Sequence, residues 1–270
     1  MYEEIRNQLS TQAQIEQFER DGFLNGGGLL SDAEVEVLRA EVMRVIDQRE
    51  RADIPQPVFV RNLTKDDSKP VWQIVNIWQA SPAFERLMMR PEITSSIAQL
   101  TGATELRIWH DQIQYKPPEI GGQTDCYQDA PLWPIIAPMT EVTAWVALDD
   151  ADKSNAFMSM VPGSHTWGNQ IDFLRTVEVY DSMPAEYGGH KVNVVRCPVK
   201  KGEVHFHHAL TWHGSHSNTS GRPRRAIALH YMTGETRYVE AGRHPMKNYV
   251  TVADGEVLQG DAFPPVYPIG

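Results

Sequence analysis

Histidines are concentrated in one short stretch of the chain. Five of the ten histidines lie in the run VHFHHALTWHGSH, which spans residues 204–216. Side chains alternate between the two faces of a β-strand, so His205 and His207 would share one face while His208 points to the other. At most two or three of these imidazoles can therefore meet at one metal ion.

His213 stands out within this run because of the residues that follow it. Ser215 lies two residues later, and Arg224 lies eleven residues later, after the turn-like sequence NTSGRP at 218–223. This spacing predicts a strand, a turn and a strand that returns antiparallel to it, with the hydroxyl and the guanidinium close to the imidazole. Arginine presents a planar fork of donors and serine adds a hydroxyl, so the trio is suited to holding a dicarboxylate.

Composition excludes several classes of function. The 270 residues include 35 acidic and 25 basic ones, a net charge of −10, whereas nucleic-acid binding relies on clustered lysine and arginine. No apolar run approaches the roughly 20 residues of a membrane span, and the first ten residues lack a signal-peptide pattern. Cys126 and Cys197 are too few for a disulfide framework. We expect a cytoplasmic, soluble protein without nucleic-acid or membrane partners; the sequence leaves the oligomeric state unknown.

The first hundred residues have a helical pattern. Thr11–Gln14 and Ser31–Glu34 each match a capping box, in which a hydroxyl and a Gln or Glu three residues later satisfy backbone N–H groups. The glycines at 26–28 are expected to separate these two helices. A third helical stretch is predicted over 82–100, with a break at Pro91 because proline removes a donor and restricts its predecessor.

From about residue 105 the pattern changes to short β-like runs without helices between them, which favours an antiparallel sandwich or jelly roll. In one run, Thr143, Trp145 and Ala147 alternate with apolar residues that point the other way. We predict a mainly β protein with flanking helices: a single domain, 1–270, whose helical flank (about 1–100) packs on a β core (about 105–235). The predicted strands are Leu106–Tyr115, Val142–Leu148, Val192–Cys197, Gly202–His207 and Arg225–Met232.

Six motifs follow one another in a fixed order between about residues 11 and 232. They are DGF (21–23), QIQYKPP (112–118), YQDAPLWP (127–134), TAWVALDDAD (143–152), VPGSHTWG (161–168) and WHGSHSNTSGRPRRAIALHYM (212–232). Together they resemble the phytanoyl-CoA dioxygenase family of iron(II)- and 2-oxoglutarate-dependent oxygenases. One motif alone is weak evidence, but six in order form a strong signal. The resemblance implies a double-stranded β-helix, a jelly roll whose mouth holds iron between a His-x-Asp pair and a later histidine.

The resemblance implies a role for each matching residue. Asp129 matches the carboxylate ligand of Fe(II), and His213 matches the distal histidine ligand. Such a triad leaves three positions open on the metal, enough for chelation by 2-oxoglutarate and binding of O2. The cosubstrate site is implied at Arg224 and Ser215, which would hold its far carboxylate, and at Trp145, Lys116 and Gln112.

The sequence departs from the family pattern at Tyr127, where the first histidine ligand belongs. Three interpretations stay open. Tyr127 binds the metal as a phenolate, which suits iron(III) more than iron(II). Alternatively, another histidine such as His110 supplies the missing nitrogen, or the protein binds little iron and keeps the pocket for a ligand without turnover.

The favoured hypothesis is an Fe(II)/2-oxoglutarate-dependent oxygenase that oxidises a small organic molecule, with Asp129, His213 and Tyr127 at the metal. The alternative is a non-catalytic relative that binds a small ligand. Residues 51–78 and 171–192 are expected to cover the mouth of the pocket, but no motif in them identifies the substrate.

Overall fold

A computed structural model describes residues 10–63, 71–119, 123–177 and 182–268 of the chain. Both capping boxes are present: the Thr11 and Ser31 side chains accept from the backbone N–H groups of Gln14 and Glu34. The expected break at Pro91 is also present, between α4 and α5. The α-helices are α2 (Gln12–Asp21), α3 (Asp32–Asp47), α4 (Pro82–Met88), α5 (Pro91–Thr101) and α6 (Ile171–Leu174). The 3-10 helices are η1 (Ile77–Gln79), η2 (Ala130–Leu132), η3 (Ser164–Trp167) and η5 (Pro245–Tyr249).

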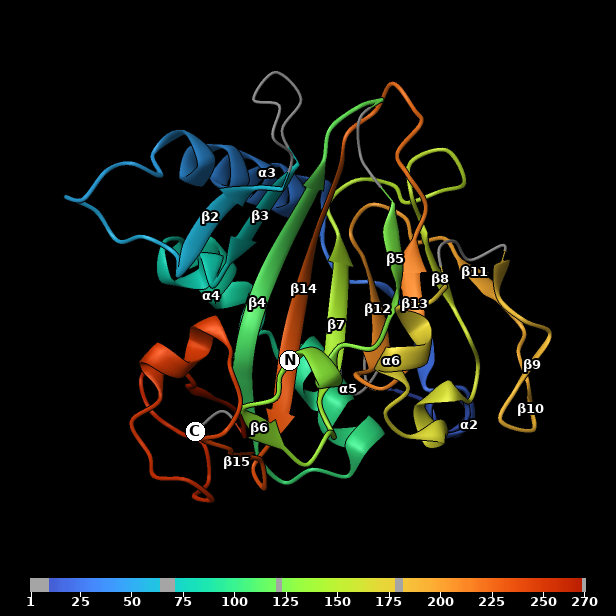
Figure 1. Ribbon diagram of the computed structural model, residues 1–270. Helices are drawn as coiled ribbons and strands as arrows, with labels where there is room; N and C mark the ends of the chain where they lie inside the picture. The colour runs from blue at the N-terminus through green and yellow to red at the C-terminus, as the bar shows by residue number, and fades with distance from the viewer. Residues whose placement is uncertain (1–9, 64–70, 120–122, 178–181, 269–270) are drawn as a thin grey trace.

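One large antiparallel sheet, the major sheet, forms the centre of the molecule (Figure 1). From β1 to β4, neighbouring strands in it are far apart in sequence, as expected for a jelly roll, whereas β3 and β2 are consecutive in the chain. Its order is β1 (Phe23–Gly28), β12 (Glu203–His208), β7 (Val142–Ala147), β14 (Arg224–Thr233), β4 (Leu106–Lys116), β3 (Trp72–Val75) and β2 (Phe59–Asn62), and β16 (Pro265–Tyr267) also pairs with β4.

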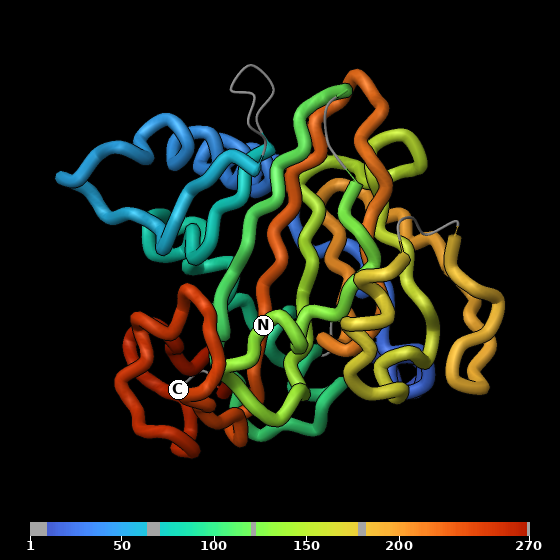
Figure 2. The backbone as a smooth tube through the Cα atoms, viewed as in Figure 1, coloured from blue at the N-terminus to red at the C-terminus, as the bar shows by residue number. Residues whose placement is uncertain are grey.

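A second, four-stranded sheet, the minor sheet, supplies the other wall of the jelly roll (Figure 1). Two further strand pairs lie outside both sheets. Figure 2 shows the C-terminal segment, in red, beside the first residues of β4. The mainly β jelly-roll fold predicted from the sequence is confirmed. The order of the minor sheet is β11 (Val195–Cys197), β8 (Met158–Met160), β13 (His213–Ser215) and β5 (Thr124–Tyr127); the pairs are β9 (Glu186–Tyr187) with β10 (His190–Lys191) and β6 (Ile136–Ala137) with β15 (Arg237–Tyr238).

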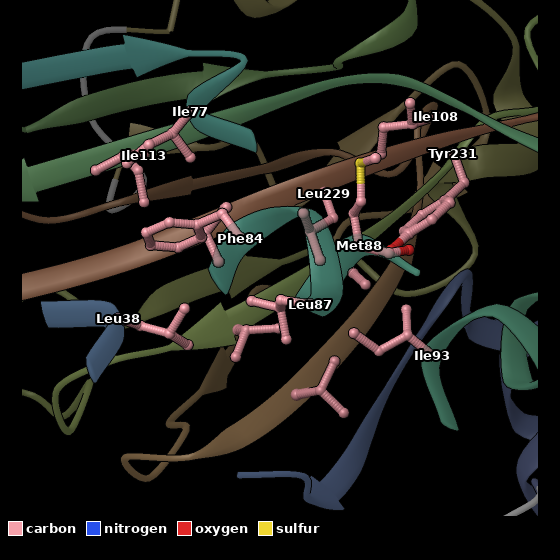
Figure 3. Packing of buried hydrophobic residues seen from close by; sticks show 14 of the residues in the cluster. Leu38, Ile77, Phe84, Leu87, Met88, Ile93, Ile108, Ile113, Leu229 and Tyr231 are labelled. Atoms are coloured by element: carbon pink, nitrogen blue, oxygen red, sulfur yellow. The ribbon is translucent and has the colours of Figure 1, made fainter. Parts of the chain in front are cut away.

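The helices α3, α4 and α5 bury their apolar faces against the outer face of the major sheet. Figure 3 shows Phe84 and Met88 of α4 packed toward Leu229 and Tyr231 of β14, and all four side chains are buried. The Tyr231 hydroxyl donates to the Met88 carbonyl oxygen at 2.9 Å, so the one polar atom at this contact is satisfied. This packing fixes the major sheet and leaves its inner face free to carry polar groups.

A β-bulge in β4 determines which of its side chains face inward. Trp109 is the extra residue of this bulge. His230 of β14 pairs with His110 of β4, and the next residue of β14, Tyr231, pairs with Ile108, so Trp109 is skipped in the pairing. One extra residue inverts the alternation of a strand. The even-numbered residues from His110 to Lys116 therefore face the interior between the sheets, whereas Ile108 packs with the helices.

The predicted helical N-terminal flank contains α2, α3, α4 and α5, but it also contains three strands of the major sheet. The glycines at 26–28 lie between α2 and α3 as expected, but they form part of β1 and not a loop, and β2 and β3 also come from this segment. Close packing explains the glycines: a Cβ on Gly26 would lie 2.6 Å from the Phe206 ring, and Gly27 has a φ of +81° at an irregularity in the pairing. The part of the flank at 1–9 lies outside the described residues. Within the described chain, no helix is both long and apolar enough to cross a membrane.

Candidate metal and cosubstrate site

A cavity of about 460 Å³ lies between the two sheets. Residues of β3, β4, β7, β12 and β14 line it from the major sheet, and residues of β5, β8 and β13 line it from the minor sheet. Its volume falls in the range of small-molecule sites. The two ends of this cavity carry different chemistry, here called the metal end and the anion end. The metal end contains Asp129, His207 and His213; the anion end contains Lys116, Ser215 and Arg224.

At the metal end, one carboxylate and two imidazoles converge. One ligand atom each from Asp129, His207 and His213 lies within 4.8 Å of the other two, and all three side chains are buried. The His207 Nε2 atom is 3.3 Å from Asp129 Oδ2, and the His213 Nε2 atom is 3.6 Å from Asp129 Oδ1. Ligands about 2.1 Å from an octahedral metal lie about 3 Å apart on adjacent positions, so these side chains need only small shifts to share one ion.

The protonation states at this end suit a divalent cation. Burial alone would raise the pKa of Asp129, but the neighbouring imidazoles of His213, His207 and His230 hold that pKa well below its usual range. Burial lowers the pKa of His213 to about 4, so its imidazole is neutral at pH 7. The Nδ1–H group of His213 donates to the Thr211 carbonyl oxygen at 2.8 Å, which leaves the Nε2 lone pair directed at Asp129. The tautomer of His213 is therefore the one that a metal requires.

Sequence reasoning does not select His207. This residue lies on β12, opposite Thr143 of the adjacent strand β7, and not in the motif that contains Asp129. The expected sharing of one strand face by His205 and His207 is confirmed, because both side chains are buried on the inner face and His208 instead contacts His165. The shared face is the one sequence feature that could have identified His207 as a candidate ligand. It does not distinguish His207 from His205, because that choice depends on the position of β12 in the sheet.

Tyr127 lies beside this group. It is directly opposite His213 in the pairing of β5 with β13, and the two ring centroids are 4.3 Å apart. Burial raises the pKa of the Tyr127 phenol well above its usual value and Asp129 raises it further, so the phenol is neutral in the metal-free protein. A role for Tyr127 as a metal ligand stays a prediction.

His110, considered as the source of the missing nitrogen, takes a different place. Its Nδ1–H group donates to the Asp111 carbonyl oxygen at 3.3 Å, and its ring packs against His230 with centroids 4.6 Å apart. Among the described residues, the three-ligand group contains His207 and does not contain His110.

The anion end unites the residues expected to hold a carboxylate. The Lys116 Nζ atom donates to Ser215 Oγ at 2.9 Å, and the Arg224 Nη2 atom donates to the same oxygen at 3.4 Å. The Arg224 guanidinium also lies over the Trp145 ring, 5.5 Å from its centroid. Lys116, Ser215, Arg224 and Trp145 thus lie together at one end of the cavity, and their role in binding a carboxylate stays a prediction.

The Arg224 side chain fits a bound anion at this end of the cavity. Its side chain is buried, yet the Nε and Nη1 atoms have no hydrogen-bond partner in the described part of the chain. Burying a guanidinium without an acceptor is costly, so a bound carboxylate would satisfy donors that the protein leaves open. The free carboxylate of 2-oxoglutarate has the required charge and geometry, and the residues present fit this cosubstrate.

Lys116 adds a second cationic group to the same end. Burial lowers the pKa of Lys116 to about 6, and the nearby Arg224 charge lowers it in the same direction. The amine is therefore largely neutral at pH 7 until an anion arrives to favour its charged form.

Gln112 lies apart from this carboxylate site. It lines the cavity, but its side chain is bonded to Gln73 on β3, whose Nε2 atom donates to Gln112 Oε1 at 2.8 Å. The bulge at Trp109 turns Gln112 inward, and the position of β4 places it two strands away from β7, the strand that carries Trp145.

The expected turn after Ser215 brings Arg224 back as predicted, but the two strands do not pair. β13 belongs to the minor sheet and β14 to the major sheet, so the turn joins the two walls of the cavity. Of the two segments expected to cover the mouth, the second contributes Ile171, Leu174 and Val177 to the lining, and the first contributes Gln73. The parts of these segments at 64–70 and 178–181 lie outside the described residues.

A jelly roll with a buried Asp and two His beside an open anion site defines a class of metal-dependent enzyme. The family model for phytanoyl-CoA dioxygenase matches residues 18–226. The chain is 26% identical to the peroxisomal phytanoyl-CoA dioxygenase of Mus musculus, over 90% of this chain and 75% of that protein. It is 27% identical to the ectoine dioxygenase of Bordetella parapertussis, over 95% of this chain and 84% of that protein.

Among solved structures, the non-heme alpha-ketoglutarate-dependent carbocyclase SnoK from nogalamycin biosynthesis matches with a TM-score of 0.78. The two sequences are 26% identical, and the match covers 97% of each chain. The chain belongs to the phytanoyl-CoA dioxygenase family and is an iron(II)- and 2-oxoglutarate-dependent oxygenase. The predicted family, activity class and cofactors are confirmed, and none of these matches favours a non-catalytic binding protein.

Proposed function

We propose that Asp129, His207 and His213 hold iron(II), and that Arg224, Ser215 and Lys116 hold the far carboxylate of 2-oxoglutarate. The observation that carries this proposal is the three-residue ligand group at one end of a cavity whose other end leaves buried guanidinium donors open. Three protein ligands on iron(II) leave three positions for the cosubstrate and O2. On this assignment His207, from β12, takes the role that a histidine at position 127 plays in the family pattern.

Geometry favours His207 over Tyr127 as the third ligand. The His207 Nε2 atom already lies 3.3 Å from the Asp129 carboxylate and within 4.8 Å of the ligand atom of His213. An imidazole nitrogen suits iron(II), whereas a phenol must first lose a proton. Tyr127 would then pack against His213 and line the cavity without binding the metal.

The protein residues have separate tasks in this arrangement. Asp129 is ionised and His213 is neutral before the metal binds, so these two ligands do not have to lose protons when it binds. Arg224 and Ser215 set the direction of the cosubstrate, and the Trp145 ring forms a buried wall that excludes water. When bound, iron(II) and 2-oxoglutarate supply the electrons for O2 activation. In the overall reaction, substrate C–H, O2 and 2-oxoglutarate give C–OH, succinate and CO2.

Several coarser properties complete the proposal. The chain acts as a single domain, supported by strands from its N-terminal, central and C-terminal parts in one sheet. It acts on a small molecule, as the names of its ectoine and nogalamycin-pathway relatives suggest, and its net charge of −10 argues against nucleic acid. It works in the cytoplasm, supported by Cys126 and Cys197, which form no disulfide.

The experiment is an anaerobic titration with Fe(II) and 2-oxoglutarate, followed by exposure to O2. We expect about one iron per chain, a visible charge-transfer band on addition of 2-oxoglutarate, and iron-dependent formation of succinate. Asp129→Ala should abolish all three, whereas Asp125→Ala, a change at an exposed carboxylate on the neighbouring strand, should abolish none. An Asp129→Ala variant that binds iron like the parent, or a parent that forms no succinate, would overturn the proposal.

A further inference from the structure

The wall of the cavity between β3 and β14 is polar but serves neither the metal nor the carboxylate. Gln73, Gln112, Gln114, His110 and His230 line it, and they lie on the three adjacent strands β3, β4 and β14. Ala228 of β14 pairs with Gln112 of β4 on one side and with Trp145 of β7 on the other. Its small side chain leaves room beside the Gln112 amide. Two hydrogen-bond chains determine what this wall offers to a ligand.

The first chain ends in a donor. The Arg61 Nε–H group donates to Gln73 Oε1 at 2.5 Å, and Gln73 Nε2 donates to Gln112 Oε1 at 2.8 Å. Arginine can only donate, so the orientations of both amides follow from it. The Gln112 NH₂ group is left facing the cavity, without a protein acceptor among the described residues.

The second chain ends in an acceptor. The Thr143 hydroxyl donates to Asp129 Oδ2 at 3.1 Å, and its oxygen accepts from His230 Nδ1–H at 2.8 Å. An ionised carboxylate can only accept, so the direction of this chain is also fixed. The Nε2 atom of His230 therefore carries a lone pair without a hydrogen-bond partner among the residues that the structure describes, and the residue lines the cavity.

His110 provides a second acceptor. Its Nδ1–H group is used by the Asp111 carbonyl oxygen, so Nε2 carries a lone pair. This atom is buried and has no partner in the described part of the protein, although the residue lines the cavity. A hydrogen-bond donor on a ligand would remove that cost.

The charges on the described lining do not call for a charged ligand. Asp129 is assigned to the metal and Arg224 to the cosubstrate, and the remaining two, Asp125 and Arg175, are exposed and of opposite sign. Arg175 also pairs with Asp172 at 3.3 Å. Apolar side chains also line the cavity, including Leu174 and Trp133, whose ring packs against His230 with centroids 4.7 Å apart.

We propose that the substrate is an uncharged, hydroxylated small molecule, whose hydroxyl groups accept from the Gln112 NH₂ group and donate to Nε2 of His230 or His110. A hydroxyl both donates and accepts, so it can pair with the donor that ends the first chain and with the acceptor that ends the second. A carboxylate only accepts and an ammonium group only donates, and each leaves part of the wall unpaired. This inference rests on the proposed function, because it requires that Asp129 binds the metal and that Arg224 binds the cosubstrate.

The test uses the full chain loaded anaerobically with Fe(II) and 2-oxoglutarate. The probes are polyhydroxylated six-membered rings that differ in charge: glucose and myo-inositol as neutral polyols, glucuronate as the anion and glucosamine as the cation. Saturation-transfer NMR measures binding up to about 10 mM, since a ligand with few contacts binds weakly. We expect a neutral probe to bind at least tenfold more tightly than both charged ones.

Two variants test the donor. Gln112→Leu removes the amide, and we expect it to weaken binding of the neutral probe about tenfold while the charge-transfer band with 2-oxoglutarate is unchanged. Gln259→Leu is the matched control, because Gln259 is exposed and does not line the cavity. The inference is overturned if no neutral probe binds, if a charged probe binds as well as glucose, or if both variants act alike. Loss of the charge-transfer band in the parent would instead contradict the proposed function.

Discussion

The two ends of the cavity meet their chemical requirements in different ways. At the anion end, Ser215 and Arg224 come from two strands joined by one turn, and Lys116 lies directly opposite Arg224 in the pairing of β4 with β14. At the metal end, Asp129 follows β5, whereas His207 comes from β12 in the other sheet. Both ends thus join the two sheets, but at the anion end one turn links Ser215 to Arg224, whereas at the metal end no short connection links Asp129 to His207.

Each end of the cavity also buries an ionisable side chain whose charged form is destabilised, a basic one at the anion end and an acidic one near the metal end. Lys116 at the anion end has its pKa lowered to about 6 by burial and by Arg224. Glu141, near the metal end, has its pKa raised to about 8 by burial and by Asp129, and both of its carboxyl oxygens are buried without a hydrogen-bond partner among the described residues. A buried amine and a buried carboxyl make protein stability depend on pH in opposite directions.

The largest effect on cosubstrate binding is expected from Arg224→Ala at the anion end. Two charge-assisted hydrogen bonds to the cosubstrate are lost, about 4 kcal/mol, so the affinity for 2-oxoglutarate should fall about 1,000-fold. Iron binding at the other end should stay within about threefold of the parent. Calorimetric titration with 2-oxoglutarate measures this, with Arg222→Ala, an exposed arginine paired with Asp152, as the control. Equal losses in the two variants would show that the anion end is elsewhere.

Lys116→Met should stabilise the fold while weakening cosubstrate binding. The unfolded chain holds the lysine proton up to about pH 10.5 and the folded chain only up to about pH 6, so stability of the parent rises with pH between these values. At about 1.4 kcal/mol per pH unit, the variant should be more stable by up to about 6 kcal/mol at pH 6 and by about 2 kcal/mol at pH 9. Denaturant unfolding at several pH values measures the difference. A gain that does not shrink with rising pH would contradict the burial of a neutral amine.

Glu141→Gln should change the pH dependence in the opposite sense. The folded chain keeps the Glu141 proton up to about pH 8, whereas the unfolded chain loses it near pH 4.5, so stability of the parent falls as pH rises through this window. The variant lacks this slope and should be more stable by about 2 kcal/mol at pH 6, with a larger gain at pH 8. The same unfolding series gives the result, and an exposed change, Glu240→Gln, is the control. A variant with the slope of the parent would rule out a protonated Glu141.

Much of the fold can be predicted because its signals are local. The capping residues Thr11 and Ser31 mark helix starts within four residues, and alternation in β7 places Trp145 on the inner face. The glycines of β1 cannot be interpreted in this way. Their place depends on contact with Phe206, about 180 residues later in the chain, and not on their neighbours.

The residues of the site also differ in whether local sequence can predict them. Asp129, His213, Ser215 and Arg224 are predictable because they lie in ordered sequence motifs. His207 is not, because the sequence shows several histidines side by side, and only the position of β12 relative to Asp129 selects one of them. The bulge that turns Gln112 toward the cavity likewise depends on the pairing of β4 with β14.

The most direct test of the ligand assignment compares metal affinity in His207→Ala and Tyr127→Phe, measured by anaerobic Fe(II) competition with a chelating dye. Removing one of three ligands should weaken iron binding at least about 100-fold in His207→Ala, a larger loss than removal of a supporting contact causes. Tyr127→Phe keeps the ring that packs on His213 and should bind iron within about threefold of the parent. The reverse order, with Tyr127→Phe losing iron and His207→Ala retaining it, would contradict the assignment.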